Sequence, residues 1–490
     1  MMAQPDIGPF LQRLPKITGL TADSRKVQPG FLFAALPGST VDGRDFIPDA
    51  VAHGAVAILA PTGTQLPAGL SGSPILMAEE EPRRRFAQAA AAFYGRQPET
   101  VAAVTGTNGK TSTAVFTQQL WQRLGISAAS LGTLGLTSPG RSIEGALTTP
   151  DPVALHALLK DLADDGVTHL AMEASSHGLD QFRLDGVTVS VAGFTNLSQD
   201  HLDYHGTMAA YLAAKRRLFT EVLRPGGVAV INADAGEAGA LGEAATAVGR
   251  RTQSFGTRGR EIRLDALAPS GSGLDLTAFV FGRRIRVTLP VVGTFQAQNA
   301  LCALGMVLAS RETVLAVDVD EAVDALAQLK GVRGRLERVG ARAHGAPVFV
   351  DYAHTPDALA TVLQCLRPHV AGQLHVVFGA GGDRDRTKRP LMGQAAATFA
   401  DQTIVTDDNP RTEDPGTIRA EVLLGCPDAL EIGDRAEAIR VGIGRLHADD
   451  LLVIAGKGHE SGQTVGRTVH PFDDATVARR VLTDLGEETA

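Results

Sequence analysis

One loop of the sequence, between residues 106 and 112, combines two glycines with a lysine and three hydroxyl side chains. An apolar run at 101–104 predicts a strand before it, and the periodic apolar pattern at 113–124 predicts a helix after it. Glycines let backbone N–H groups point towards an anion, and a helix start adds partial positive charge. The lysine can reach nucleotide phosphates, and a hydroxyl can bind Mg²⁺. The loop consists of Gly106, Thr107, Asn108, Gly109, Lys110, Thr111 and Ser112.

This loop is shorter than the full P-loop pattern, which needs a further glycine upstream. The alternative interpretation is an ordinary glycine-rich turn before a helix. The strand and helix predicted on either side favour the phosphate-binding interpretation, because that context is the one in which such loops bind nucleotides.

Three further polar side chains are candidates for chemistry. Glu173 ends an apolar run at 169–173, and polar groups at the carboxyl ends of parallel strands lie where ligands bind. His201 follows a strand predicted at 189–194, and Lys215 lies on a helix predicted at 207–223. A carboxylate and an imidazole can bind a metal, although each is often only hydrogen-bonded, and a helix lysine is usually solvated. Taken alone, these motifs predict a nucleotide-using α/β protein.

Several strands predicted in the last third of the chain also end in polar residues. The strand at 348–351 ends in an aspartate, and the strand at 375–378 leads into a second glycine loop at 379–385. The strands at 403–406 and 451–455 lead into polar segments at 407–411 and 456–460. The alternative is that these segments are only flexible or structural turns.

Composition narrows the class of protein. The net charge is −8 without a basic run, and aromatic residues make up 5%, which argues against a nucleic acid partner. The three cysteines have no metal-binding spacing and are typical of a reducing compartment such as the cytoplasm. No run of 18 apolar residues predicts a membrane span, and the first residues lack a signal-peptide pattern.

Length and element order predict an α/β protein of three domains. The 490 residues are enough for about three domains. We place a small α/β domain at 1–95, a central domain with a parallel sheet at 96–332, and a Rossmann-like domain at 333–490. Residues 252–292 lose helical periodicity and predict a β-rich insert in the central domain.

The order of the motifs resembles that of the Mur ligase family. The resemblance runs from Asp23-Ser24-Arg25 to Gly458-His459-Glu460, nearly the whole chain, and the short phosphate loop is normal in this family. It implies an N-terminal domain that binds a UDP-sugar, a central ATPase domain and a C-terminal domain that binds an amino acid. The motifs are Gly106–Ser112, Glu173–His177, Asp200–Asp203, Ala214-Lys215, Asn299, Gly334-Arg335, Asp351–His354 and Asp408–Arg411.

The resemblance implies ATP-dependent amide formation in peptidoglycan precursor synthesis, by a cytoplasmic monomer. A carboxylate of UDP-MurNAc-L-Ala-D-Glu would take the γ-phosphate of ATP, and the amine of meso-diaminopimelate would displace phosphate from the acyl phosphate. The implied cofactors are ATP, Mg²⁺ and a CO₂-derived carbamate on Lys215. Thr111 and Glu173 would hold one Mg²⁺, and His201 with the modified Lys215 would hold another. The implied catalytic residues are Lys110, Glu173, His201 and Lys215.

The resemblance also assigns ligand contacts. Asn299, Arg335 and Asp351 would contact the nucleotide. Leu147 stands where some members carry asparagine, which leaves a contact there open. The uridine end and the muramoyl-dipeptide would be held by Ser24, Ser39, Thr40 and Val41, and by Thr148, Thr149, Ser175, Gln181 and Arg183.

The choice of amino acid depends on the far end of meso-diaminopimelate, which carries a carboxylate that lysine lacks. A guanidinium binds carboxylate bidentately, and Arg411 follows a proline that stiffens its turn. Glu460 is suited to pairing the distal ammonium. By resemblance, the pocket would contain Arg384, Asp408, Asn409, Pro410, Arg411, Gly456 and Glu460.

Three other functions remain open. A P-loop motor or switch would need a separate Walker B strand and a switch region, and neither is clear in the sequence. A folylpolyglutamate synthase shares the phosphate loop, but the domain before that loop and the segment 408–411 argue against it. A lysine-adding member of the same family is the third.

Overall fold

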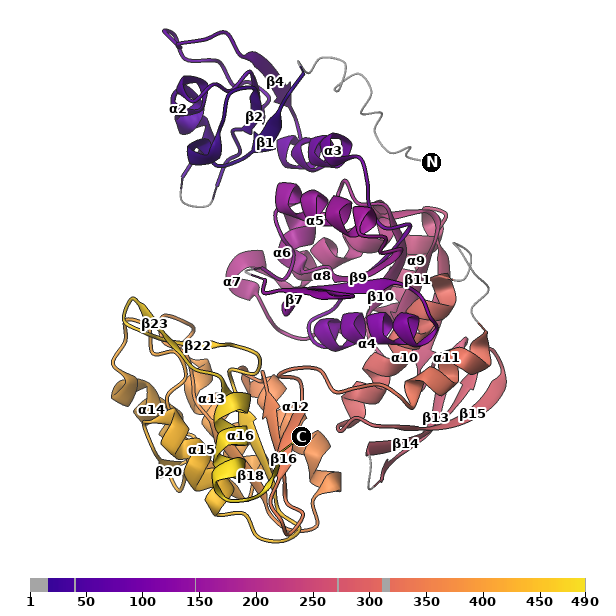
Figure 1. The fold of residues 1–490 in the computed structure, drawn as a ribbon, viewed down its shortest axis with the longest axis vertical. Coiled ribbons are helices and arrows are strands. Elements are labelled where there is room, and N and C mark those ends of the chain that lie inside the picture. Colours follow the sequence, from indigo (N-terminus) through magenta and orange to yellow (C-terminus); the bar gives the residue numbers. More distant parts are fainter. Residues whose placement is uncertain (1–15, 39–40, 146, 271–272, 311–317, 490) are drawn as a thin grey trace. The chain divides into compact units, whose positions relative to one another are not determined.

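The apolar runs of the sequence form three large sheets and one hairpin in the described residues of the computed structural model (Figure 1). The structure describes residues 16–38, 41–145, 147–270, 273–310 and 318–489. One compact unit comprises Met1–Leu264, Phe279–Arg283 and Asn299–Ala325, and the other comprises Asp265–Ala278, Arg284–Gln298 and Leu326–Ala490. The predicted α/β class with three domains is confirmed, whereas the boundaries at 95 and 332 remain a prediction.

The first sheet has four parallel strands in the order of the chain. Side chains alternate between its two faces, as a strand requires. Leu32 and Ala34 pack with α3, whereas Phe33 packs on the opposite face with α2. The elements are β1 (Gly19–Thr21), η1 (Ser24–Lys26), β2 (Phe31–Ala34), η2 (Gly43–Phe46), α2 (Ile47–Ala52), β3 (Ala57–Pro61), β4 (Ile75–Glu79) and α3 (Pro82–Tyr94).

The second sheet has the strand order β15-β14-β13-β12-β11-β10-β5-β9-β6-β7-β8 in the described residues. Its middle strands are parallel, so that their carboxyl ends share one edge. The strands are β5 (Thr100–Thr105), β6 (Ala128–Gly132), β7 (Gly135–Ser138), β8 (Arg141–Ile143), β9 (His169–Glu173), β10 (Val189–Phe194), β11 (Leu223–Asn232), β12 (Arg251–Gly256), β13 (Ile262–Ser270), β14 (Gly273–Val280) and β15 (Arg283–Leu289).

Helices cover both faces of the middle strands, which explains why these strands are continuous apolar runs. Leu155 and Leu159 of α5 share one core with β9 and β10. Met306 of α10 packs against Gly193 of β10. A Cβ added at Gly193 would lie 2.8 Å from the Met306 sulfur. The helices are α4 (Lys110–Arg123), α5 (Pro152–Asp164), α6 (Ser176–Asp180), α7 (Leu202–His205), α8 (Met208–Arg217), η3 (Leu218–Val222), α9 (Ala238–Ala247), α10 (Thr294–Ala309) and α11 (Val319–Leu326).

The third sheet has the order β20-β19-β18-β21-β17-β16-β24 in the described residues. The strands from β20 to β17 are parallel, and β16 and β24 are antiparallel additions at one edge. The strands, with a separate hairpin, are β16 (Glu337–Ala341), β17 (Pro347–Asp351), β18 (Leu374–Phe378), β19 (Gln402–Val405), β20 (Leu430–Glu431), β21 (Leu451–Ala455), β24 (Glu488–Thr489), and β22 (Gly462–Val465) with β23 (Thr468–Pro471).

The third sheet is doubly wound, as predicted. Val376 and Phe378 point into a core shared with α12, α13 and α14, whereas Val377 between them points into a core with α15 and α16. The two faces therefore carry separate cores. The helices are α12 (Pro356–Leu366), η5 (Arg367–His369), α13 (Lys388–Phe399), α14 (Pro415–Leu423), α15 (Arg435–Gly444) and α16 (Asp474–Asp484).

One sequence prediction needs adjustment and another is confirmed. The helix predicted at 207–223 is α8, which ends at Arg217 and continues as the wider turn η3, and Leu223 already begins β11. The β-rich insert predicted at 252–292 is confirmed as the strands β12 to β15. None of the described helices combines the length and apolar composition that crossing a lipid bilayer requires.

Candidate active site

The loop between β5 and α4 has the shape of an anion cradle. Gly106 has φ of 156°, and a Cβ there would lie 1.9 Å from Thr195 Oγ1. Gly109 has φ of 87°, and a Cβ there would lie 2.3 Å from Asn299 Oδ1. These angles and close approaches require glycine. Asn299, predicted to contact the nucleotide, therefore lies against this loop.

Hydrogen bonds fix the phosphate loop, residues 106–112. The Lys110 ammonium donates to the carbonyl oxygens of Gly106 at 2.9 Å and Thr107 at 2.7 Å. The Asn108 N–H donates to Asn196 Oδ1 at 2.9 Å. Asn196 follows β10, at the carboxyl end of a parallel strand, where polar side chains are expected to bind ligands. The loop is thus shaped by a neighbouring strand end as well as by its own glycines.

Lys215 lies at the same loop although it is distant in sequence. Its side chain is 1% exposed, and its Nζ donates to the Gly106 carbonyl at 2.8 Å. The Nζ also lies 4.2 Å from the centre of the Tyr211 ring. One carbonyl oxygen therefore accepts bonds from both Lys110 and Lys215. This position excludes the solvated-lysine alternative.

The environment of Lys215 favours its neutral amine. Burial, and then the positive charge of Lys110, lower the pKa of Lys215 well below its ordinary value, while Asp200 opposes this change. A neutral lysine amine is a nucleophile, whereas the ammonium is not. The site can therefore present Lys215 for covalent modification.

Glu173 ends β9 and is 1% exposed. Its Oε1 accepts the Thr133 N–H at 2.7 Å, and its Oε2 accepts the Thr133 hydroxyl at 3.2 Å. Thr148, a predicted substrate residue, shares a hydrogen bond of 3.0 Å with the same hydroxyl. No motif in the sequence indicated Thr133, which lies in the turn between β6 and β7.

The predicted muramoyl-dipeptide residues form one hydrogen-bonded group. Thr149 Oγ1 donates to the Glu173 carbonyl at 3.1 Å and accepts from Ser175 Oγ at 3.0 Å. Arg183 donates to the Thr149 carbonyl at 2.7 Å and to Gln181 Oε1 at 2.8 Å. These side chains are therefore adjacent to the predicted metal ligand Glu173. Their contacts with substrate remain a prediction.

His201 occupies the N-cap position of the short helix α7 and has a left-handed backbone φ of 52°. Its ring lies 4.9 Å from the His177 ring and 6.1 Å from the Tyr211 ring, measured between centroids. Burial lowers the pKa of His201; Asp200 opposes this change, whereas Lys110 and Lys215 add to it. A neutral imidazole is the form that binds metals.

The predicted uridine-binding residues lie in the first sheet's domain. Ser24 begins η1, and Val41 is 60% exposed just before η2. Ser39 and Thr40 lie outside the described residues. Leu147, where a contact was left open, is 51% exposed.

Metal binding at the phosphate loop would need donors beyond the usual side chains. Among the described residues, no cluster of three or more His, Cys, Asp or Glu side chains could hold a metal. Thr111 belongs to the phosphate loop and lies in the first turn of α4, and Glu173 supplies a buried carboxylate. Oxygen donors of this kind suit Mg²⁺. The donor set fits Mg²⁺ when Lys215 carries a carbamate in place of its positive charge.

A second group of predicted residues lies in the other compact unit. Asp351 ends β17 and accepts the N–H groups of Leu336 and Ala353, each at 2.8 Å. Burial raises the pKa of Asp351, and Arg335 opposes this change. The Arg335 guanidinium lies 4.6 Å from the centre of the Tyr352 ring. Arg335 and Asp351 are thus brought together, as expected for residues that contact one ligand.

The segment 408–411 follows β19 and is hydrogen-bonded both to the second glycine loop and to the hairpin strand β22. Arg411 has a φ of 51°, and its guanidinium donates to the Gly382 carbonyl at 2.8 Å. Its N–H donates to the Thr464 carbonyl at 3.0 Å. Here the guanidinium holds backbone carbonyls, and its pairing with a carboxylate ligand remains a prediction.

Residues that follow the carboxyl ends of β19 and β21 contact one another through their side chains. Asn409 Nδ2 donates to Glu460 Oε2 at 2.8 Å. Gly456 has φ of 115°, and a Cβ there would lie 2.8 Å from Asp408 Oδ2. Arg384 is exposed on the second glycine loop and donates to the Asp383 carbonyl at 3.2 Å. Most of the predicted amino-acid pocket is therefore brought together, and Arg384 lies at its exposed side.

Sequence reasoning missed Lys457 within this group. Its side chain is fully buried, and its Nζ donates to Glu460 Oε2 at 2.9 Å and Asn409 Oδ1 at 3.2 Å. The lysine lies between two glycines in the printed sequence, a context that usually predicts exposure. Its burial could be recognised only from the fold.

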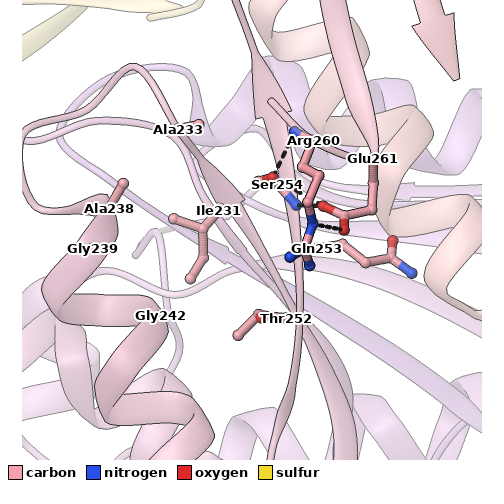
Figure 2. Close-up of a pocket in the computed structure, with 10 residues that line it drawn as sticks. All are labelled: Ile231, Ala233, Ala238, Gly239, Gly242, Thr252, Gln253, Ser254, Arg260 and Glu261. Carbon is pink, nitrogen blue, oxygen red and sulfur yellow. Dashed lines mark hydrogen bonds and ion pairs between the residues drawn. The ribbon is translucent and has the colours of Figure 1, made fainter. Parts of the chain in front are cut away.

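A cavity of about 300 Å³ lies elsewhere, between α9 and the strands β11 and β12 (Figure 2). Small side chains of α9 form one wall, and an ion pair of 2.7 Å between Arg260 and Glu261 lies at the polar edge. None of the predicted site residues lines this cavity. It therefore adds no group to the chemistry at the phosphate loop.

Three family models match the chain in succession. They are the Mur ligase family, catalytic domain, over residues 16–107, the Mur ligase middle domain over residues 104–307, and the Mur ligase, glutamate ligase domain, over residues 334–458. A UDP-N-acetylmuramoyl-L-alanyl-D-glutamate–2,6-diaminopimelate ligase of Bradyrhizobium diazoefficiens is 53% identical over 478 residues. The match covers 95% of this chain and 96% of the relative.

Solved structures show the same likeness. A structure of a UDP-N-acetylmuramoyl-L-alanyl-D-glutamate–2,6-diaminopimelate ligase is 35% identical, with a TM-score of 0.71 and coverage of 96% of both chains. A folylpolyglutamate synthase of Mycobacterium tuberculosis, in complex with ADP and AMPPCP, has a TM-score of 0.64 at 20% identity. It covers 84% of this chain and 96% of its own, and at this identity the likeness concerns the fold alone.

Proposed function

Because the chain belongs to the Mur ligase family, we propose that it joins meso-diaminopimelate to UDP-MurNAc-L-Ala-D-Glu in an ATP-dependent step of peptidoglycan precursor synthesis. The observation that carries the proposal is the position of Lys215 on the Gly106 carbonyl of the phosphate loop. A switch or motor has no need of a buried, readily neutral lysine at its phosphates. A ligase of this family uses such a residue to support phosphoryl transfer.

The phosphate loop positions ATP and stabilises charge. Lys110 leaves the carbonyls of Gly106 and Thr107 to bind the transferred phosphoryl group, while the N–H groups at the start of α4 bind its oxygens. The substrate carboxylate attacks the γ-phosphorus, the bond to the ADP oxygen breaks, and an acyl phosphate forms. The amine of the amino acid then attacks the acyl carbon, phosphate leaves, and the amine loses a proton.

Two Mg²⁺ ions would neutralise phosphate charge in this reaction, one held by Thr111 and Glu173 and the other by His201 and a carbamate on Lys215. Both lysine Nζ atoms donate to the Gly106 carbonyl, so a protonated Lys215 would place a second positive charge there and repel the metal. Repulsion between two like unit charges about 4 Å apart costs roughly 4 kcal/mol at an effective dielectric of 20. The neutral Lys215 amine instead adds to CO₂, with loss of one proton, and provides negatively charged oxygens.

The amino acid is proposed from the pocket after β19 and β21. Arg411 would leave the Gly382 carbonyl and bind the distal carboxylate, and Glu460 would bind the distal ammonium. Lysine lacks that carboxylate and would leave the guanidinium without its partner. Sites built on such contacts reject the incomplete ligand by about 10⁴-fold or more. The relatives named for diaminopimelate favour this choice over a lysine-adding ligase.

The test is ligation by the purified chain with ATP, Mg²⁺ and UDP-MurNAc-L-Ala-D-Glu. Phosphate release and product mass are measured with meso-diaminopimelate, L-lysine and no amino acid. We expect a product of the added mass only with meso-diaminopimelate. Equal kcat/KM for lysine would overturn the amino-acid assignment, and phosphate release that needs no amino acid would favour a P-loop motor. The cytoplasmic location and the monomeric state stay predictions.

A further inference from the structure

Lys457 is a buried cation that the proposed reaction does not yet use. It follows β21, its side chain is fully buried, and its Nζ donates to three oxygen atoms. These are Glu460 Oε2 at 2.9 Å, Asn409 Oδ1 at 3.2 Å and the Gly462 carbonyl at 2.6 Å. Burying an ammonium is costly, so a buried lysine needs such a set of acceptors.

The three acceptors come from separate segments of the chain. Asn409 follows β19, Glu460 lies in the segment after β21, and Gly462 begins the hairpin strand β22. Strands β19 and β21 lie on either side of β18 in the sheet. Lys457 therefore joins two strand ends and the hairpin at one point.

The bonds leave one oxygen of Glu460 for a ligand. Oε2 accepts from both Asn409 Nδ2 at 2.8 Å and Lys457 Nζ at 2.9 Å. Oε1 takes no bond from the part of the chain that the structure describes, and the Glu460 side chain is 33% exposed. The carboxylate is thus held by one oxygen and offers the other to solvent.

We propose that Lys457 is a positioning residue that fixes Glu460 so that Oε1 receives the distal ammonium of the amino acid. This inference rests on the proposed function and deepens it. Lys457 acts through Glu460 and does not touch the ligand itself. Without Lys457, the carboxylate would lose its charged partner and could rotate away from the ammonium, so discrimination for that ammonium would fall.

A ligand pair isolates this contact. 2-Aminopimelate keeps both carboxylates and the reacting amine of diaminopimelate, and lacks only the distal amine. The unmodified chain should prefer diaminopimelate over 2-aminopimelate in kcat/KM. In K457M, which keeps an unbranched side chain only one heavy atom shorter and removes the charge, that preference should fall by about 10- to 100-fold, the size of one charge-assisted hydrogen bond. The KM for ATP should stay unchanged.

Three further variants complete the test. E460Q should lose the same preference, and K457M added to E460Q should have little further effect, because the two residues act as one unit. K16M removes an exposed lysine as a matched control and should behave as the unmodified chain. If K457M does not fold, K457Q provides the same comparison with a shorter polar side chain.

Each outcome decides the inference. An unchanged preference in a folded Lys457 variant, or effects of K457M and E460Q that simply add, would overturn it. A KM for ATP that rises together with that for diaminopimelate would show a general structural role and would also overturn it. Failure of the unmodified chain to ligate diaminopimelate is a different result, which overturns the proposed function.

Discussion

The Lys110 ammonium is hydrogen-bonded within the phosphate loop that it is proposed to serve. Its ammonium satisfies the carbonyls of Gly106 and Thr107, and the loop is also held by Asn196 and by its glycines. We therefore expect Lys110→Ala to fold normally and to retain less than about a tenth of the ligation rate, since one lost charge contact in phosphoryl transfer costs more than tenfold. Phosphate release measures this. A variant above that level would contradict the phosphate role.

Lys215 should be active only as its carbamate. Removal of the side chain in Lys215→Ala deletes the proposed oxygen ligands and should nearly abolish ligation. A small carboxylate such as acetate can enter the space left behind and supply oxygens, so partial rescue is expected. Propylamine, which restores bulk without a carboxylate, is the control and should not rescue. Full activity of Lys215→Ala would show that the lysine is structural.

Arg411 provides a third test at a single side chain. Arg411→Ala should raise the KM for diaminopimelate by about 10-fold or more, the value of a lost charge-assisted contact, and leave the KM for ATP near its original value. Arg411→Lys keeps the charge but loses the planar guanidinium. Its KM for diaminopimelate should lie between that of the unmodified chain and that of Arg411→Ala. Equal changes in both KM values would mean that Arg411 only holds the Gly382 carbonyl.

Residue types at motifs could be predicted from the sequence, but burial could not. Glu173 and Asp351 were placed at strand ends by the apolar runs before them, and the structure confirms both positions. Lys215 and Lys457 look like solvated lysines in any local window. Their burial results from contacts with residues far away in sequence, namely Gly106 and Asn409. Thr133 was not predicted either, because its contact is with Glu173, 40 residues away in the sequence.

Strands were predictable where both of their faces are buried, because such strands consist almost entirely of apolar residues. The parallel strands β5, β9, β10 and β21 are covered on both faces and are continuous apolar runs, so they were predicted within a residue or two. The hairpin of β22 and β23 was not predicted, because β23 is exposed, β22 is only half-buried, and neither strand contains an apolar run. This hairpin nevertheless holds Asn409 through the Thr464 N–H, at 2.9 Å.

Helix α15 offers a test of how one element is held. Its N-cap Asp434 accepts the Glu437 N–H at 2.8 Å. Asp434→Ala loses this bond and should destabilise α15 by about 1 kcal/mol, whereas Asp434→Asn keeps a capping oxygen. The measurement is hydrogen exchange of the α15 amides, which should speed up roughly fivefold in the alanine variant alone. Equal exchange in both variants would rule out the capping contribution.

Over the whole chain, parallel topology explains why distant motifs converge. Carboxyl ends of neighbouring parallel strands share an edge, so the motifs after β5, β9 and β10 meet in one sheet, and those after β17, β19 and β21 meet in another. The sequence predicted which strands end in polar residues. It could not predict strand order, such as β18 lying between β19 and β21, because order depends on packing between helices that single-sequence patterns do not reveal.

The stability of the molecule should depend on pH through buried histidines. His156 on α5 is 3% exposed, and burial lowers its pKa to about 4 from an ordinary 6.5. The unfolded chain therefore binds the proton more readily between these values, and stability present above pH 6.5 is lost as pH falls towards 4. For this one group, lowering the pH from 7 to 5 should cost about 2 kcal/mol of unfolding free energy.

His156→Gln removes the titrating group and should reduce the loss of stability between pH 7 and pH 5 by about 2 kcal/mol, the linkage expected for such a shift. Urea unfolding followed by fluorescence measures this in the relevant domain, because Trp121, the single tryptophan, lies on α4 beside the same sheet. His470→Gln, at an exposed position on β23, is the matched control and should lose stability as the unmodified chain does. If both variants lose stability equally between the two pH values, His156 is not a source of the acid sensitivity.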